Sequence, residues 1–452
     1  MHTEVTRNTM AYPTVPSFNL LGRVGLTLGV FAILMPTAFQ SGIGGLLLIW
    51  FLSSSSWREL RKKRAREFSW SVYEPVFFVM LKWIFVAACV QLVLLFVNEF
   101  GSSGFTERLR LMGKQGVYGL VVMSIYALAK ERKFKLADVS LAILSLVLIL
   151  TVYNAFQRYT GIDWVHGFGT KLGDNRFAYG VYRVSGFMSH PLTFAYNTVI
   201  FYTLCLTLGF SSMPGSRERY VWFACAALAL VNLFLSSSRW PLFVGLIVSC
   251  IFFIRNTRLS RTRLLTGSIG LMMLLGLALV ASPQVMGRFS EIFSAEGALY
   301  ERMPRLAFWK VHLAMFLDHP LFGVGLTDIK AITADYYQAA GFASLERKYA
   351  AHNIYLQTLA DSGIVGLVGL VALLTGSFLA GRLIVRSAKA NGKAYQAQLG
   401  YGWQVLVIAV VLAGLMQNNL RDSEHVMALW LAMAAILTRM PAKIKLQPKA
   451  RD

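Results

Sequence analysis

A chain of 452 residues that is 56% hydrophobic and only 15% charged is not an ordinary soluble protein. We interpret it as an all-α polytopic membrane protein, because the length suits about ten to fourteen spans rather than several soluble domains. The net charge of +22 can orient the spans and attract anionic lipids or phosphate-bearing substrates. Nucleic acid is a weaker candidate partner, because the basic residues are scattered among short loops. The four cysteines lie in apolar runs without paired spacing, so neither disulfides nor a metal site is expected.

The first half of the chain is predicted to hold a leader and six spans. The leader covers 1–17, and the spans fall near 18–37, 42–55, 74–97, 113–129, 136–156 and 191–210. Lys and Arg cluster after the second and fourth spans, from Arg58 to Arg66 and from Lys130 to Lys135, which assigns these loops to the cytoplasm. The polar loop 157–189 is then expected on the opposite, outer face.

The second half is predicted to add six more spans. They fall near 220–237, 241–254, 264–281, 353–381, 400–418 and 426–439. The predicted regions are a cytoplasmic leader 1–17, a bundle of helices 1–9 over 18–281, an outer loop 282–351, helices 10–12 over 352–440 and a cytoplasmic tail 441–452. Every loop assigned to the cytoplasm is rich in Lys and Arg, and twelve spans place both termini inside.

Within the long outer loop, 303–317 is expected to form an amphipathic helix that starts near Pro304. The expected apolar face carries Leu306, Trp309, Leu313 and Phe316. The expected polar face carries Arg302, Arg305 and His312. Such a helix would lie along the membrane surface or cover the mouth of the bundle.

His352 and Asn353 stand where this outer loop enters the tenth span. Histidine is the usual side chain for proton transfer near neutral pH, since its ordinary pKa is about 6.5. Arg239 stands in a very short outer turn between two spans, where an arginine is costly unless it pairs or binds an anion. The alternatives are that His352 only caps a helix and that Arg239 extends to lipid headgroups.

Four patches in order along the chain resemble the bacterial O-antigen ligases, and more loosely the O-antigen polymerases. The first is Arg183-Val184-Ser185-Gly186 with His190-Pro191, and the second is Ser236-Ser237-Ser238-Arg239. The third runs from Arg305 to Trp309 and on into His319-Pro320-Leu321-Phe322-Gly323-Val324-Gly325. The fourth is His352-Asn353, nine residues, Gly363, two residues and Gly366. The family usually has small residues after the arginine of the second patch, whereas this chain has Trp240-Pro241, which leaves the local packing open.

The resemblance implies a GT-C-like fold of about twelve transmembrane helices with one long, partly helical periplasmic loop. It implies transfer of a glycan from undecaprenyl diphosphate to a sugar hydroxyl of lipid A-core at the periplasmic face of the bacterial inner membrane. The partners would be this donor, this acceptor and membrane lipids, without nucleic acid, nucleotide, metal or cofactor. Fixed guanidinium groups can stabilise a diphosphate leaving group, because they bind phosphate bidentately and stay charged.

On this resemblance, His352 is the expected base, and Arg183 and Arg239 are expected to stabilise the leaving group. Such a reaction is a single displacement that inverts the anomeric centre. Residues expected to bind the diphosphate or the glycan are Arg176, Arg302, Arg305, Trp309 and Asn353.

Three functions remain open from the sequence. A polymerase of the same superfamily is the close alternative, and a transporter or flippase for a lipid-linked anion is the distant one. A transporter should carry charges at mid-membrane in broken helices, whereas these candidates lie at one face. Asp422 is expected to pair with Arg421 rather than to orient the base.

Overall fold

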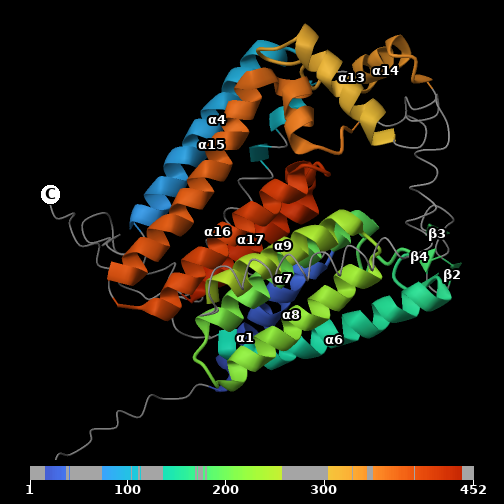
Figure 1. Cartoon of the computed structure of the whole chain (residues 1–452). Coiled ribbons are helices and arrows are strands. Elements are labelled where there is room, and N and C mark those ends of the chain that lie inside the picture. The colour runs from blue at the N-terminus through green and yellow to red at the C-terminus, as the bar shows by residue number, and fades with distance from the viewer. Residues whose placement is uncertain are drawn as a thin grey trace, which may run out of the picture.

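Helices dominate the described part of the chain (Figure 1). The computed structural model describes residues 16–36, 40, 74–102, 104–109, 112–113, 136–167, 170–171, 177–178, 181–256, 304–327, 329–343, 350–390 and 392–439. The helices are α1 (Pro16–Phe31), α4 (Glu74–Asn98), α6 (Leu136–Thr160), α7 (Pro191–Ser211), α8 (Arg217–Leu235), α9 (Arg239–Asn256), α13 (Pro304–Asp318), α14 (Ile329–Ala339), α15 (Ile354–Ala390), α16 (Ala394–Gly414) and α17 (Ser423–Thr438). Two 3₁₀ turns are η1 (Ala32–Leu34) and η4 (Asn419–Arg421).

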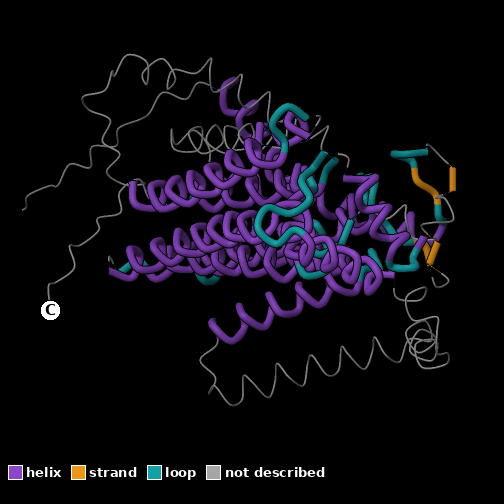
Figure 2. The backbone as a smooth tube through the Cα atoms, turned by 90° about the horizontal axis from the view of Figure 1, so that it is seen from above, coloured by secondary structure: helices purple, strands orange, loops and turns teal. Residues whose placement is uncertain are grey.

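Two small antiparallel hairpins precede α7. Strand β1 (Ile162–Asp163) pairs with β2 (Thr170–Lys171), and β3 (Phe177–Ala178) pairs with β4 (Val181–Tyr182). Seen from above, the strands lie beyond one end of the helix bundle (Figure 2). They belong to the polar loop expected at 157–189.

Six helices among the described residues are long and apolar enough to cross a membrane: α6, α7, α8, α9, α15 and α16. Shorter apolar helices cover Arg23–Leu34, Lys82–Asn98 and Ser423–Thr438. The predicted class, an all-α polytopic membrane protein, is confirmed. Nine of the twelve predicted spans overlap these helices. The other three, 42–55, 113–129 and 264–281, lie outside the described residues apart from residue 113. Which face is the periplasmic one stays a prediction.

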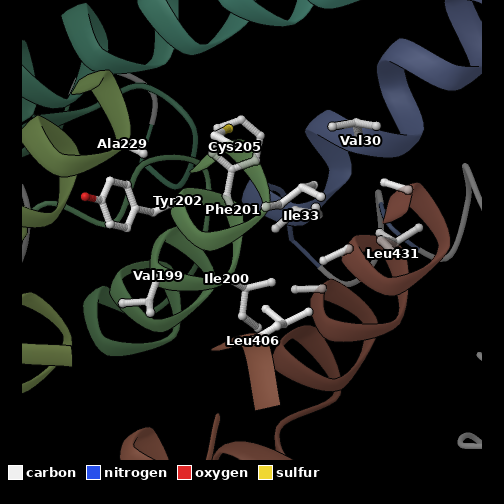
Figure 3. Close-up of a cluster of buried hydrophobic side chains, with 14 of the residues drawn as sticks. Val30, Ile33, Val199, Ile200, Phe201, Tyr202, Cys205, Ala229, Leu406 and Leu431 are labelled. Carbon is white, nitrogen blue, oxygen red and sulfur yellow. The ribbon is translucent and has the colours of Figure 1, made fainter. Parts of the chain in front are cut away.

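Helix α7 forms the centre of the bundle, since 89% of the residues in its most apolar 18-residue stretch are buried. It packs against α8, α9, α16 and α17. Figure 3 shows Ile200, Phe201 and Cys205 of α7 beside Ile33 of η1 and Leu406 of α16, which all belong to one buried apolar cluster. This cluster fixes α7 and the helices around it, and so it positions the loops at their ends.

Helix α15 packs along α4 and α16, and α13 and α14 lie at the end of the α4–α15 pair (Figure 1). The sequence predicts a continuous span over 353–381, but α15 is broken at Gly363, whose φ of 59° and ψ of −162° are not helical. This backbone region is essentially open to glycine alone.

The loop after α13 supplies the hydrogen bonds that the break removes from α15. Val324 N and Gly325 N donate to the carbonyls of Ala360 and Asp361, over 2.9 and 3.1 Å. In return, Ile364 N donates to the Pro320 carbonyl over 2.9 Å, and Val365 N donates to the Leu321 carbonyl over 3.2 Å. These four bonds, which we call the splice, join the third and fourth sequence patches into one structure.

A buried ion pair lies behind the splice. Arg108 donates to Glu99 over 3.1 Å, and both side chains are almost fully buried. Glu99 also accepts from Leu326 N over 2.5 Å and from Thr327 Oγ1 over 2.7 Å, which ties it to the segment that follows the splice. The pair therefore anchors the end of α4 to the loop between α13 and α14.

The buried face of α13 differs from the predicted one. Its buried residues are Ala307, Phe308, Val311, His312 and Met315, whereas Leu313 is 44% exposed. Helix α13 packs against both α15 and α14, so its contact face is set by two neighbours that the periodicity alone does not reveal. His312 is tolerated in this face because its Nδ1 bonds the Phe308 carbonyl over 2.7 Å.

Candidate functional site

Arg183 lies between β4 and α7, half-buried, and donates to Ser238 Oγ over 3.3 Å. Burial lowers the pKa of its guanidinium, and the charges of Arg305 and Arg239 lower it further. Arg183 is therefore close enough to both Arg239 and Arg305 for their charges to act on it. Arg183 Nε is buried and has no hydrogen-bond partner among the described residues. We call Arg183, Arg239 and Arg305 the arginine cluster.

Arg239 is the exposed first residue of α9 and follows a tight turn. Ser237 in this turn has a φ of 52°, which few residues other than glycine adopt. Arg158, near the end of α6, donates to the Leu235 carbonyl over 2.9 Å and to Ser237 Oγ over 2.6 Å. Trp240 Nε1 donates to the Leu412 carbonyl over 2.8 Å, so this departure from the family pattern anchors α9 to α16. The turn that presents Arg239 is thus held by Arg158, by the Arg183–Ser238 hydrogen bond and by the contact of Trp240 with α16.

Arg305 is the second residue of α13, and its Nη1 lies 3.4 Å from the sulfur of Met416. Both Arg239 and Arg305 stand in the first turn of a helix, where the backbone N–H groups already carry partial positive charge. Cations are normally disfavoured at such positions. Their presence here makes the cluster strongly attractive to an anion.

His352 lies just before α15 with a φ of 50°, in the left-handed region. Its Nδ1 is 3.0 Å from Gln417 Oε1, in the loop between α16 and α17. Its ring lies 5.9 Å from that of Phe308, one turn along α13 from Arg305. The same loop therefore contacts both sites: Met416 contacts Arg305, and Gln417 contacts His352. His352 and Arg305 are thus linked through Phe308 of α13 and through the loop between α16 and α17.

Trp309 and Asn353 hold the segment that carries His352. Trp309 Nε1 donates to the Ala351 carbonyl over 3.1 Å. Asn353 Oδ1 caps α15, because it accepts from Tyr355 N over 3.0 Å and from Leu356 N over 3.1 Å. Trp309 Nε1 and Asn353 Oδ1 are thus used within the protein. These bonds leave the face of the indole and the amide nitrogen of Asn353 for a ligand.

A second ion pair fixes the loop between α16 and α17. Arg421 pairs with the buried Asp361 of α15, which also accepts from Gln357 Nε2 over 3.0 Å. The expected pairing of Arg421 with Asp422 is wrong. Asp422 accepts from Thr193 Oγ1 over 2.7 Å and caps α17 through Glu424 N over 3.0 Å, so its carboxylate is already used.

Arg176 and Arg302 lie outside the described residues. The sequence reasoning missed Arg158, Gln417 and Tyr196. Tyr196, on α7, is 1% exposed, and its hydroxyl has no hydrogen-bond partner within the described residues. The contact of Arg158 with the turn at 236–238 could not be predicted because the two segments are far apart in the sequence. No local sequence pattern marks Gln417 or Tyr196.

Residues 224–371 match the model of the family described as O-antigen ligase. The matched segment is thus similar to that family. It includes Arg239, Arg305 and His352 and ends just beyond the break in α15, whereas Arg183 and Gln417 lie outside it. The match confirms the resemblance seen in the sequence and supports membership of the O-antigen ligase and polymerase superfamily of membrane glycosyltransferases. No curated protein matches the chain.

Proposed function

We propose that this protein transfers a glycan from undecaprenyl diphosphate to a sugar hydroxyl of lipid A-core at the periplasmic face of the bacterial inner membrane. The observation that carries the proposal is the arginine cluster, drawn from a loop and two helix starts, beside a histidine that precedes α15. Lipid-linked glycans and lipid acceptors are the substrates that the family match implies in general.

The cluster suits a diphosphate leaving group. The charges of Arg239 and Arg305 act unfavourably on that of Arg183, and a doubly charged anion would relieve this repulsion. Because their positions are fixed by Ser238, by the turn before α9 and by the first turn of α13, little reorganisation is needed as negative charge develops. These guanidinium groups supply the positive charge, so the proposed reaction is metal-independent.

His352 is the proposed base. In a single displacement, the acceptor oxygen bonds to the anomeric carbon while the bond from that carbon to the diphosphate oxygen breaks. The hydroxyl proton passes to His352, and the configuration at the anomeric carbon inverts. General base catalysis of this kind contributes roughly 10²–10⁴-fold to the rate.

The remaining predicted residues take roles around this core. Arg305 belongs to the diphosphate site, and we assign Arg176 and Arg302 to the same donor site. Trp309 and Asn353 are proposed to contact the glycan only through the indole face and the amide nitrogen, because their other polar atoms hold the His352 segment.

Reconstitution tests the proposal and separates it from its alternatives. Purified protein is combined with a lipid-diphosphate-linked glycan and rough lipopolysaccharide, with neither nucleotide nor added metal. Transfer onto lipopolysaccharide supports the ligase, and elongation of the lipid-linked glycan supports the polymerase. The absence of any covalent product refutes both, and movement of the donor across the bilayer without chemistry then supports a flippase.

A further inference from the structure

Gln417 faces the proposed base from a loop that no sequence pattern singles out. Its Oε1 lies 3.0 Å from His352 Nδ1. We propose that Gln417 is a positioning residue for the transfer: its amide oxygen accepts the Nδ1 proton of His352, so that the basic lone pair of the imidazole is on Nε2. This inference rests on the proposed function, in which His352 takes the proton of the acceptor hydroxyl.

One oxygen atom links the two segments that carry His352 and Gln417. Gln357 Oε1 accepts from Ala351 N over 2.8 Å and from Asn418 Nδ2 over 2.8 Å. Ala351 precedes His352, and Asn418 follows Gln417. The neighbours of both partners therefore bond to the same atom of a buried side chain, which fixes the separation of the imidazole from the amide.

The loop that carries Gln417 is also tied to three helices. Arg421 pairs with Asp361 of α15, Asn419 Nδ2 donates to the Val410 carbonyl of α16 over 2.9 Å, and Asp422 accepts from Thr193 of α7. Because these bonds already fix the loop, the Gln417 amide oxygen loses little conformational freedom when substrate binds. This is the arrangement that orientation of a catalytic histidine requires.

A neutral amide suits this site better than a carboxylate. A carboxylate at the same place would raise the pKa of His352 and would compete with the diphosphate for the arginine cluster. Asp361 and Asp422 are both engaged elsewhere, by Arg421 and by the start of α17. The charged and titratable groups on the surrounding described elements include Arg183, Arg239, Arg305, Lys310, His312, Asp318, Tyr355, Asp361, Arg421, Asp422 and Glu424.

The experiment measures the pH dependence of kcat for transfer in wild type, Gln417→Glu and Gln417→Leu. Gln417→Glu is close to isosteric, and its negative charge favours the imidazolium, so the acidic limb should move to higher pH by about one unit or more. Gln417→Leu removes the acceptor and should lower the plateau kcat by roughly tenfold with little change in KM. Gln338→Glu, an exposed change of the same type on α14, is the matched control and should leave the limb unmoved.

The proposal is overturned if Gln417→Leu keeps the wild-type kcat, or if the acidic limb of Gln417→Glu coincides with that of wild type and of Gln338→Glu. Failure of the proposed function itself is recognised by the wild-type protein and by His352→Ala. If wild type transfers nothing, or if His352→Ala transfers at the wild-type rate, the assignment of the base falls and this inference falls with it.

Discussion

Gly363→Ala tests whether the splice holds the site together. An added Cβ would fall 2.5 Å from Phe322 N and closer still to the Leu321 carbonyl. Both are backbone atoms, so no side-chain rotation relieves the contact. The substitution should therefore force apart the loop 319–325 and the broken turn of α15.

The expected cost has two parts. A residue with a side chain at this φ and ψ loses about 1–3 kcal/mol. Separation of the two segments also weakens four backbone hydrogen bonds, each with a net value of about 1 kcal/mol. The sum is on the order of 5–7 kcal/mol at full loss of the splice. Because α13 leads directly into this loop, Arg305 should be displaced and transfer should fall along with stability.

The assay is the apparent melting temperature of purified protein in detergent, together with the transfer rate. Gly341→Ala is the matched control, since Gly341 has a φ of 77° but nothing lies within 4 Å of its added Cβ. This control carries the strain of a positive φ without the collision. A fall in melting temperature for Gly363→Ala no larger than that for Gly341→Ala would refute the reasoning.

Three further substitutions test the site and its support. His352→Ala should abolish transfer while expression and melting temperature stay near wild type, and a retained rate would remove His352 from the mechanism. Arg239→Lys keeps the charge but loses the planar fork, so a large loss of transfer is expected, and near-normal activity would indicate simple lipid contact. Glu99→Ala leaves Arg108 buried without its carboxylate and should destabilise the protein by about 3–5 kcal/mol, measured by denaturation against wild type.

Hydropathy was enough to predict the long apolar helices among the described residues, because a membrane span needs a long apolar run, whereas α14 was not predicted. The proximity of Arg183, Arg239 and Arg305 needed the order of the family patches, since nothing local relates residues so far apart. The break at Gly363 was not predicted. The apolar pattern continues through it, and the groups that compensate for it come from residues 320–325, on the other side of α14.

The errors share a physical cause, which is competition among partners. Arg421 has an acidic neighbour in Asp422, yet it pairs with Asp361 because Asp422 is occupied by Thr193 and by the start of α17. Helix α13 buries a face other than the predicted one because it packs against both α14 and α15. Gln417 has no sequence signature at all, since a single polar residue in a short loop is ordinary.

The threonines of the central helix bear on how the protein is made. Thr198, Thr203 and Thr207 of α7 are buried, and each hydroxyl bonds the carbonyl four residues earlier, over 2.7–2.8 Å. These three hydroxyl groups bring no unmet hydrogen bond into lipid before α16 and α17 have been synthesised, whereas Thr193 of α7 gains its partner Asp422 only when the start of α17 arrives. We therefore expect α7 to leave the translocon as an independent span and to be enclosed later, when the last helices arrive. The order of synthesis would thus decide when the core closes.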